Sequence, residues 1–283
     1  EQTSGPITRD VDGTELAVIH NGTPDGAAGL FYDAESFSQE FLLSSSGEQS
    51  LKWLVGAFYF HDNAFSRSGT DLPVFNFPYI QNFAHNTTDA YAFFASLNYD
   101  LTENLGLNTG LRYSNEEKEF SDTRVRDFTL VGGPVTQKDD WSSWTPKIGL
   151  DYFVNEDVML YVSASRGFKS GGFNSTGALG EPSLEPEILD AYEIGAKTTF
   201  LDGRMRLNIS AFDYDYTDMQ VLAVNPAAPG GIFRNAGEAA VQGMEVELSA
   251  LTLQSLQLDV GLAWLDAEYT EFTNYVLNQE FDY

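Results

Sequence analysis

The chain has 283 residues, of which 42 are acidic and 15 are basic, and its formal net charge is −27. This balance argues against a nucleic-acid partner, because binding a polyanion requires a footprint of lysine and arginine. The absence of cysteine excludes a disulfide framework and thiolate metal sites. The longest apolar run, residues 53–60, is far shorter than the roughly 20 residues of a membrane-spanning helix. If the chain crosses a membrane, it crosses as β-strands.

Alternating apolar and polar residues predict about ten antiparallel strands. Residues 1–33 have no sustained period and are expected to form a loop. They begin without a methionine or a signal sequence, so the chain is expected to start after processing or within a longer protein. Two strands flank a predicted tight turn at Asp202 and Gly203. The other strands are expected at 34–45, 50–61, 88–101, 105–116, 144–152, 158–166, 236–249 and 256–269.

The predicted connections alternate between short and long. Short turns are expected at 46–49, 102–104, 155–157, 202–203 and 250–255, and long loops at 62–87, 117–142, 167–186 and 222–235. A soluble β-sandwich, the alternative fold, has no reason to place every long loop at one end. An outer-membrane barrel does, because its periplasmic turns are short and its extracellular loops are long.

The spacing of aromatic residues supports the membrane interpretation. Tyr91 and Tyr99 lie eight residues apart on one apolar face, as do Trp144 and Tyr152, and Tyr192 and Phe200. Eight residues span roughly 26 Å along a strand, or about 20 Å in projection at a tilt near 40°. That height approaches the roughly 25 Å of the apolar band between the aromatic girdles of a transmembrane barrel.

Several motifs fail as sites for cofactors, metals or catalysis. Residues 167–170 lack the glycine before lysine that a phosphate loop requires, and residues 213–224 lack the glycine and glutamate of a calcium loop. The three histidines, at 20, 61 and 85, lack the spacing of metal ligands. No nucleophile elbow is present, so an outer-membrane hydrolase is unsupported. No cofactor, metal site or enzymatic activity is predicted.

Three segments together carry a family resemblance. SRGFKSGGFN at 165–174, AYEIGAK and FLDGRMRLN within 191–208, and NAGEAAVQGMEVE at 235–247 resemble the barrel of TonB-dependent outer-membrane receptors of the siderophore-receptor type. The resemblance extends from about residue 37 to residue 269. It implies a barrel of 22 strands closed by an N-terminal plug. Residues 1–283 show neither plug nor TonB box and lack the last strands, so they are expected to be a central part of the barrel domain.

The resemblance implies active import of a scarce ligand, such as a ferric siderophore, across the outer membrane. Energy would come from the TonB complex through the plug, and the lipid bilayer would surround the barrel. A passive pore or an adhesive barrel is the alternative function. The expected ligand contacts combine cationic, aromatic and amide groups at the end of one strand, where Arg and Lys suit anionic oxygen donors: Arg166, Phe168, Lys169, Phe173 and Asn174. The alternative for this segment is a purely structural strand end.

Overall fold

The computed structural model describes residues 27–47, 49–72, 77–126, 129–174, 180–224, 231–253, 256–276 and 279–282; predictions for residues 1–26 and for the intervening gaps lie outside these ranges. Ten long strands form one antiparallel sheet in chain order. They are β1 (Ala27–Ser44), β2 (Leu51–Leu72), β3 (Phe77–Asp100), β4 (Leu105–Arg126), β5 (Thr129–Asn155), β6 (Val158–Lys169), β7 (Glu187–Phe200), β8 (Met205–Thr217), β11 (Gly237–Leu253) and β12 (Leu256–Val276).

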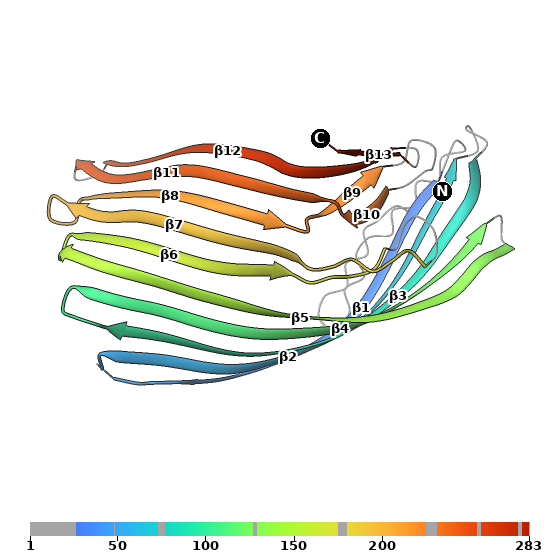
Figure 1. The fold of residues 1–283 in the computed structure, drawn as a ribbon, viewed down its shortest axis with the longest axis horizontal. Helices are drawn as coiled ribbons and strands as arrows, with labels where there is room; N and C mark the ends of the chain where they lie inside the picture. The colour runs from blue at the N-terminus through green and yellow to red at the C-terminus, as the bar shows by residue number, and fades with distance from the viewer. Residues whose placement is uncertain are drawn as a thin grey trace.

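The sheet curves but does not close (Figure 1). A short strand, β13 (Gln279–Asp282), continues the sheet beside β12, and within the described residues β1 pairs only with β2. A separate hairpin of β9 (Gln220–Val224) and β10 (Gly231–Asn235) lies between β8 and β11 in sequence. No helix in the described part of the chain is long and apolar enough to cross a membrane. The predicted all-β, antiparallel, partial up-and-down architecture is confirmed.

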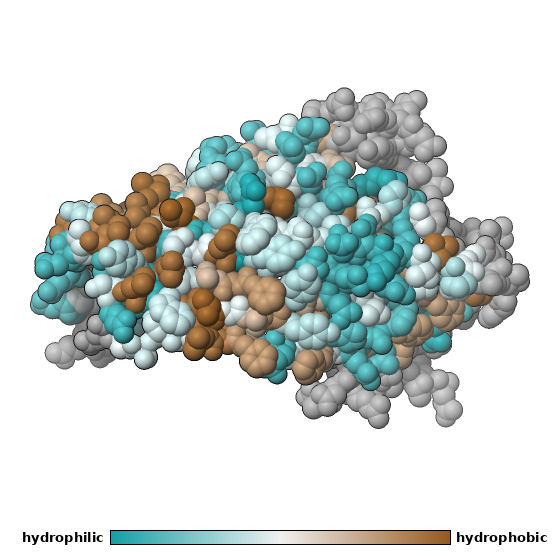
Figure 2. Space-filling model, turned by 60° about the horizontal axis from the view of Figure 1, so that its bottom comes forward, coloured by the Kyte–Doolittle hydropathy of each residue, from teal (hydrophilic) through white to brown (hydrophobic). Residues whose placement is uncertain are grey.

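The two faces of the sheet differ as the alternation predicts. Near the end with the short turns, outward side chains are apolar and exposed, including Phe93, Ile148 and Ile194 at 59%, 54% and 61%. Figure 2 shows apolar residues gathered toward this end and hydrophilic residues over the other. The apolar band is bounded on the far side by outward aromatic residues, which we call the aromatic girdle: Tyr59, Tyr91, Trp144, Tyr192 and Trp264.

The strands beyond the girdle are longer than the sequence predicts. Most of the expected loop at 62–87 belongs to β2 and β3, and most of the one at 117–142 belongs to β4 and β5. The register between β3 and β4 runs unbroken from Asp100 with Gly106 to Ile80 with Arg126. These predicted loops are therefore wrong. Beyond the girdle both faces carry many polar residues, so pairing continues where the apolar alternation fades.

Two other connections also differ from expectation. The predicted turn at Asp202 and Gly203 is a four-residue loop, because Phe200 pairs with Met205. Leu201, Asp202 and Gly203 all have positive φ, one residue more than the two that a type I′ turn requires. The predicted loop at 222–235 contains parts of β9 and β10, strand β1 already begins within the predicted loop at 1–33, and the predicted tail after 269 is part of β12 and β13.

Candidate functional site

A cavity of about 330 Å³ lies on the inward face of the sheet, beyond the girdle. Its wall consists of the extended ends of β1 to β4, and residues between β6 and β7 close one side. Ala64 and Ala84, both buried, leave the space open. The cavity offers aromatic rings, three hydroxyl groups, an amide and one ammonium group, from Tyr32, Ser66, Asn86, Thr88, Lys118, Phe120 and Phe173.

The segment between β6 and β7 folds back against the inward face of β4 and β5. We call its described residues, 170–174 and 180–186, the β6–β7 connection. Lys118 Nζ donates a hydrogen bond of 2.8 Å to the carbonyl oxygen of Gly171 and lies 5.6 Å from the ring centroid of Trp141. A Cβ on Gly171 would lie 2.1 Å from the Leu184 carbonyl oxygen. Only glycine allows this approach.

An aromatic cluster holds the connection in place. The Phe173 ring stacks on Phe120 at 5.8 Å between centroids and meets Trp141 edge-on at 5.7 Å. Trp141 is only 4% exposed. Aromatic pairs in such geometry stabilise the contact beyond the area removed from water. Since the connection closes the cavity, this cluster sets the cavity's shape.

Hydrogen bonds tie the same connection to the β9–β10 hairpin. Asn174, itself buried, donates to the Phe233 carbonyl oxygen at 3.0 Å and accepts from the Phe233 amide at 2.7 Å. Arg234 forms an ion pair of 3.2 Å with Glu181. The connection therefore bridges the inward face of β4 and β5 to the hairpin, a span that sequence spacing does not reveal.

One buried carboxyl group adjoins the cavity. Asp122 shares the inward face of β4 with Phe120, and its partner across the sheet is Ala84, which lines the cavity. Its Oδ1 atom has no hydrogen-bond partner in the described part of the chain. Burial raises the pKa of the Asp122 carboxyl group above its ordinary value, although nearby Arg124 acts in the opposite direction.

Residues 9–281 match the family described as "TonB dependent receptor-like, beta-barrel". The chain belongs to the TonB-dependent receptor barrel family. The metal-pseudopaline receptor of Pseudomonas aeruginosa is 30% identical over 193 residues, or 67% of this chain and 26% of the receptor. The ferric-pyoverdine 358 receptor of Pseudomonas putida is 29% identical over 72% of this chain and 24% of its own length.

A solved structure shows the same fold. The ferric yersiniabactin uptake receptor of Yersinia pestis superposes with a TM-score of 0.76 at 18% identity, over 91% of this chain and 38% of that one. The present chain thus spans about a quarter of the curated relatives it matches. It is part of an outer-membrane barrel, and its outward apolar band faces the bilayer.

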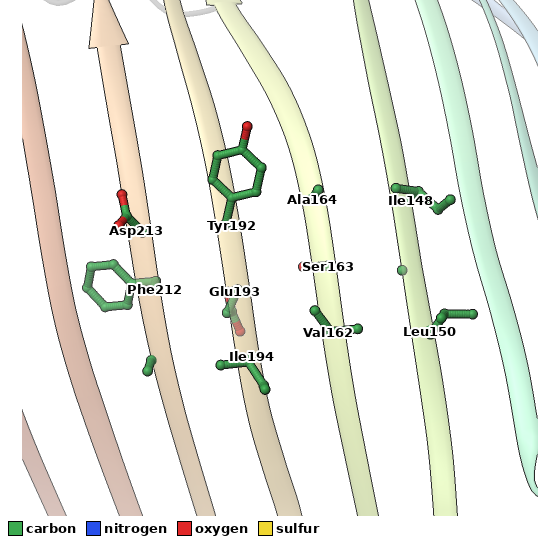
Figure 3. Close-up of a pocket in the computed structure, with 12 residues that line it drawn as sticks. Ile148, Leu150, Val162, Ser163, Ala164, Tyr192, Glu193, Ile194, Phe212 and Asp213 are labelled. Carbon is green, nitrogen blue, oxygen red and sulfur yellow. The ribbon is translucent and has the colours of Figure 1, made fainter.

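A second hollow belongs to that lipid-facing surface. It measures about 600 Å³ and lies across β5 to β8, where the short side chain of Ala164 sits among larger ones. Figure 3 shows Ile148, Val162, Tyr192 and Ile194 around it. Its apolar wall faces away from the interior of this TonB-dependent receptor barrel, so we assign it to acyl-chain contact and not to the transported ligand.

The five residues expected to contact ligand divide between the outward and the inward sides of the sheet. Arg166 lies on the outward face beyond Tyr192, and alternation places Phe168 on that face too. The Arg166 guanidinium binds both carboxylate oxygens of Asp190, at 2.7 and 2.6 Å. This hydrogen bonding holds the pKa of Asp190 below its ordinary value.

The other three lie inward. Lys169 Nζ is 3.6 Å from Glu187. Phe173 lines the cavity. The side-chain amide of Asn174 already makes two hydrogen bonds with the backbone of Phe233. The structure thus does not bring the predicted set together at one site.

Sequence reasoning missed the residues that form most of the cavity. Asn86 lay in the predicted loop at 62–87, Thr88 lay at the start of the next predicted strand, and Lys118 lay in the predicted loop at 117–142. A signal was nonetheless present, since Glu116, Lys118 and Phe120 keep a two-residue period beyond the apolar stretch. Such a period of mixed polarity indicates a strand that has left the membrane but is still paired.

Proposed function

We propose that the protein containing this chain is an outer-membrane receptor for TonB-dependent uptake of a scarce ligand such as a ferric siderophore. Family membership supports transport, and two relatives are named as receptors for metal-pseudopaline and ferric-pyoverdine. The observation that carries the proposal is the inward cavity at the extracellular end, closed by the tethered β6–β7 connection. A concave site with aromatic walls and few polar groups suits a small ligand.

In this proposal, residues 1–283 supply wall, lumen and mouth, whereas the plug, the contact with the TonB complex and the remaining strands lie elsewhere in the protein. The lumen wall is polar within the membrane band: Tyr161 donates a hydrogen bond to Glu193, and Lys197 lies 5.4 Å from the Tyr161 ring centroid. No enzymatic role is proposed. Of the five sequence-predicted contacts, we retain Phe173 and Lys169, which are on the inward face.

Ligand binding to the full-length receptor in detergent tests this function. Ferric siderophores, cobalamin and oligosaccharides are compared by quenching of intrinsic Trp and Tyr fluorescence. Saturable binding of one class is expected. Asn86→Ala removes a polar group from the cavity and should weaken that binding about tenfold, the loss of one well-placed hydrogen bond. Arg166→Ala, on the outward face, is the matched control and should leave affinity unchanged. Binding of no class would favour a passive pore or an adhesive barrel.

A further inference from the structure

We propose that the mouth cavity selects metal chelates that are neutral or positively charged over polyanionic ones. This inference rests on the proposed uptake function and names its ligand class. It reverses the expectation from sequence, where Arg166 and Lys169 suggested anionic oxygen donors. The evidence is the balance and pairing of charges on the inward surface beyond the girdle.

The cations of this surface are already engaged. Lys118 pairs with Glu116 at 3.2 Å as well as with the Gly171 carbonyl oxygen. Arg124 donates to Asn82 Oδ1 at 2.9 Å. Lys169 forms an ion pair with Glu187, and Arg234 of β10 forms one with Glu181.

Carboxylates outnumber these cations. Asp62 pairs across the sheet with Thr88, which lines the cavity. Burial, and to a smaller extent the nearby Asp62 carboxylate, raise the pKa of the Tyr32 hydroxyl. Asp139 accepts a hydrogen bond of 2.6 Å from the Ser183 hydroxyl of the β6–β7 connection. The inward carboxylates are Asp62, Glu116, Asp122, Asp139, Glu181 and Glu187, against Lys118, Arg124, Lys169 and Arg234. Among the side chains that the structure describes on this surface, carboxylates therefore outnumber cations by six to four.

Asp122 provides an acceptor beside the cavity. Its Oδ1 atom is buried and unpaired within the described residues, which is a costly state for a carboxyl group. Because Asp122 is buried and does not line the cavity, it acts on a bound ligand only through its charge, which adds to the balance of the inward surface.

The expected size of the effect follows from Coulomb's law. At separations near 10 Å in water, a few negative charges favour a singly positive over a singly negative chelate by roughly tenfold at 0.01 M salt. Screening reduces this preference to about threefold at 0.15 M. Salt dependence thus separates charge selection from shape selection.

The experiment measures dissociation constants of ferric complexes for the full-length receptor at low and physiological salt. The probes are a linear ferric trihydroxamate with a free terminal amine, its acetylated neutral and succinylated anionic forms, and a ferric tris-catecholate. We expect a cationic or neutral complex to bind most tightly. The affinity of the anionic complexes should rise as salt is added. If the tris-catecholate bound most tightly and its affinity fell as salt was added, the inference would be overturned while the uptake function would be supported. Binding of none would overturn the proposed function itself.

Adjacent residues on β4 and β5 offer matched variants. Glu116→Gln with Asp139→Asn removes two inward charges, whereas Glu117→Gln with Asp140→Asn removes two outward charges at the same height. The inward pair should reduce the discrimination between cationic and anionic probes about fivefold at low salt, and the outward pair should not. Equal effects would refute the inference. Asp62 forms no ion pair within the described residues, so Asp62→Asn repeats the test should the inward double variant fold poorly.

Discussion

The strands of this barrel are built differently on the two sides of the aromatic girdle. On the membrane side, β5 points Ile148 and Leu150 outward to lipid and Gly149 and Asp151 inward. Beyond the girdle, the same strand points Asp140 outward and Trp141 inward. The apolar face thus changes sides along one strand. Lipid stabilises the first half, whereas the second half needs its own packed cluster.

This difference explains why the β6–β7 connection folds inward. Beyond the girdle, water bathes the outward face, so apolar side chains are stabilised only by packing on the inward face. Phe120, Trp141 and Phe173 do so, and the mouth gains a rigid wall. Substitutions that act in one region and not the other test this comparison.

The largest effect is expected from Trp141→Ala. Loss of this buried ring should destabilise the attachment of the β6–β7 connection by about 3 to 5 kcal/mol. Hydrogen exchange of peptides covering 170–174 should rise, and trypsin should cleave after Lys169. Trp144→Ala, three residues away but 58% exposed on the outward face, should change neither. Unchanged protection in Trp141→Ala would show that the cluster does not hold the connection.

A charge placed in the membrane band should reduce stability slightly less than the loss of the Trp141 ring. Ile148→Arg puts a guanidinium near the middle of the outward apolar band, which should destabilise the barrel by about 2 to 4 kcal/mol. Ser142→Arg lies on the same face of β5 beyond Trp144 and should cost less than about 1 kcal/mol. Heat-induced unfolding in lipid vesicles measures both. Equal costs would mean that the girdle does not mark the membrane boundary.

Asn174→Ala tests the tie between the connection and the hairpin. It leaves the Phe233 amide and carbonyl without their present partner, which should cost about 2 kcal/mol locally. Limited proteolysis should then reach the β9–β10 hairpin sooner. Lys169→Ala removes only an exposed ion pair of 3.6 Å and should have little effect. If Lys169→Ala exposed the hairpin to protease more than Asn174→Ala, the ion pair between Lys169 and Glu187 would hold this region more strongly than Asn174 does.

The smallest effect is a gain in stability from Asp122→Asn. A carboxyl group whose pKa is raised in the folded state contributes stability below its unfolded pKa, near 3.9, and that contribution disappears as pH rises through the folded pKa. At pH 7 the asparagine variant should therefore be more stable, by about 1 kcal/mol, and near pH 3 it should show no such gain. Unfolding temperatures of the variant and of the unsubstituted protein between pH 3 and pH 7 test this prediction. Asp140→Asn, exposed on the outward face, is the matched control.

The sequence predicted the half of the barrel that lies in the membrane. Tyr91 and Tyr99, or Trp144 and Tyr152, bracket an alternation strong enough to assign faces, because lipid and lumen impose opposite polarity on neighbouring residues. The family resemblance in segments 165–174 and 235–247 is likewise a property of sequence alone, and the family match confirms it.

Only the tertiary structure decided the mouth. Arg166 and Phe173 are close in sequence, yet one pairs with Asp190 on the outward face and the other packs between Phe120 and Trp141 on the inward face. Their separation depends on how a long connection folds against strands far away in sequence. The amino-acid order determines alternation within a strand by itself, because side chains change faces at every residue. It does not show which distant surface a connection will meet, because that depends on packing among residues that only the folded sheet brings together.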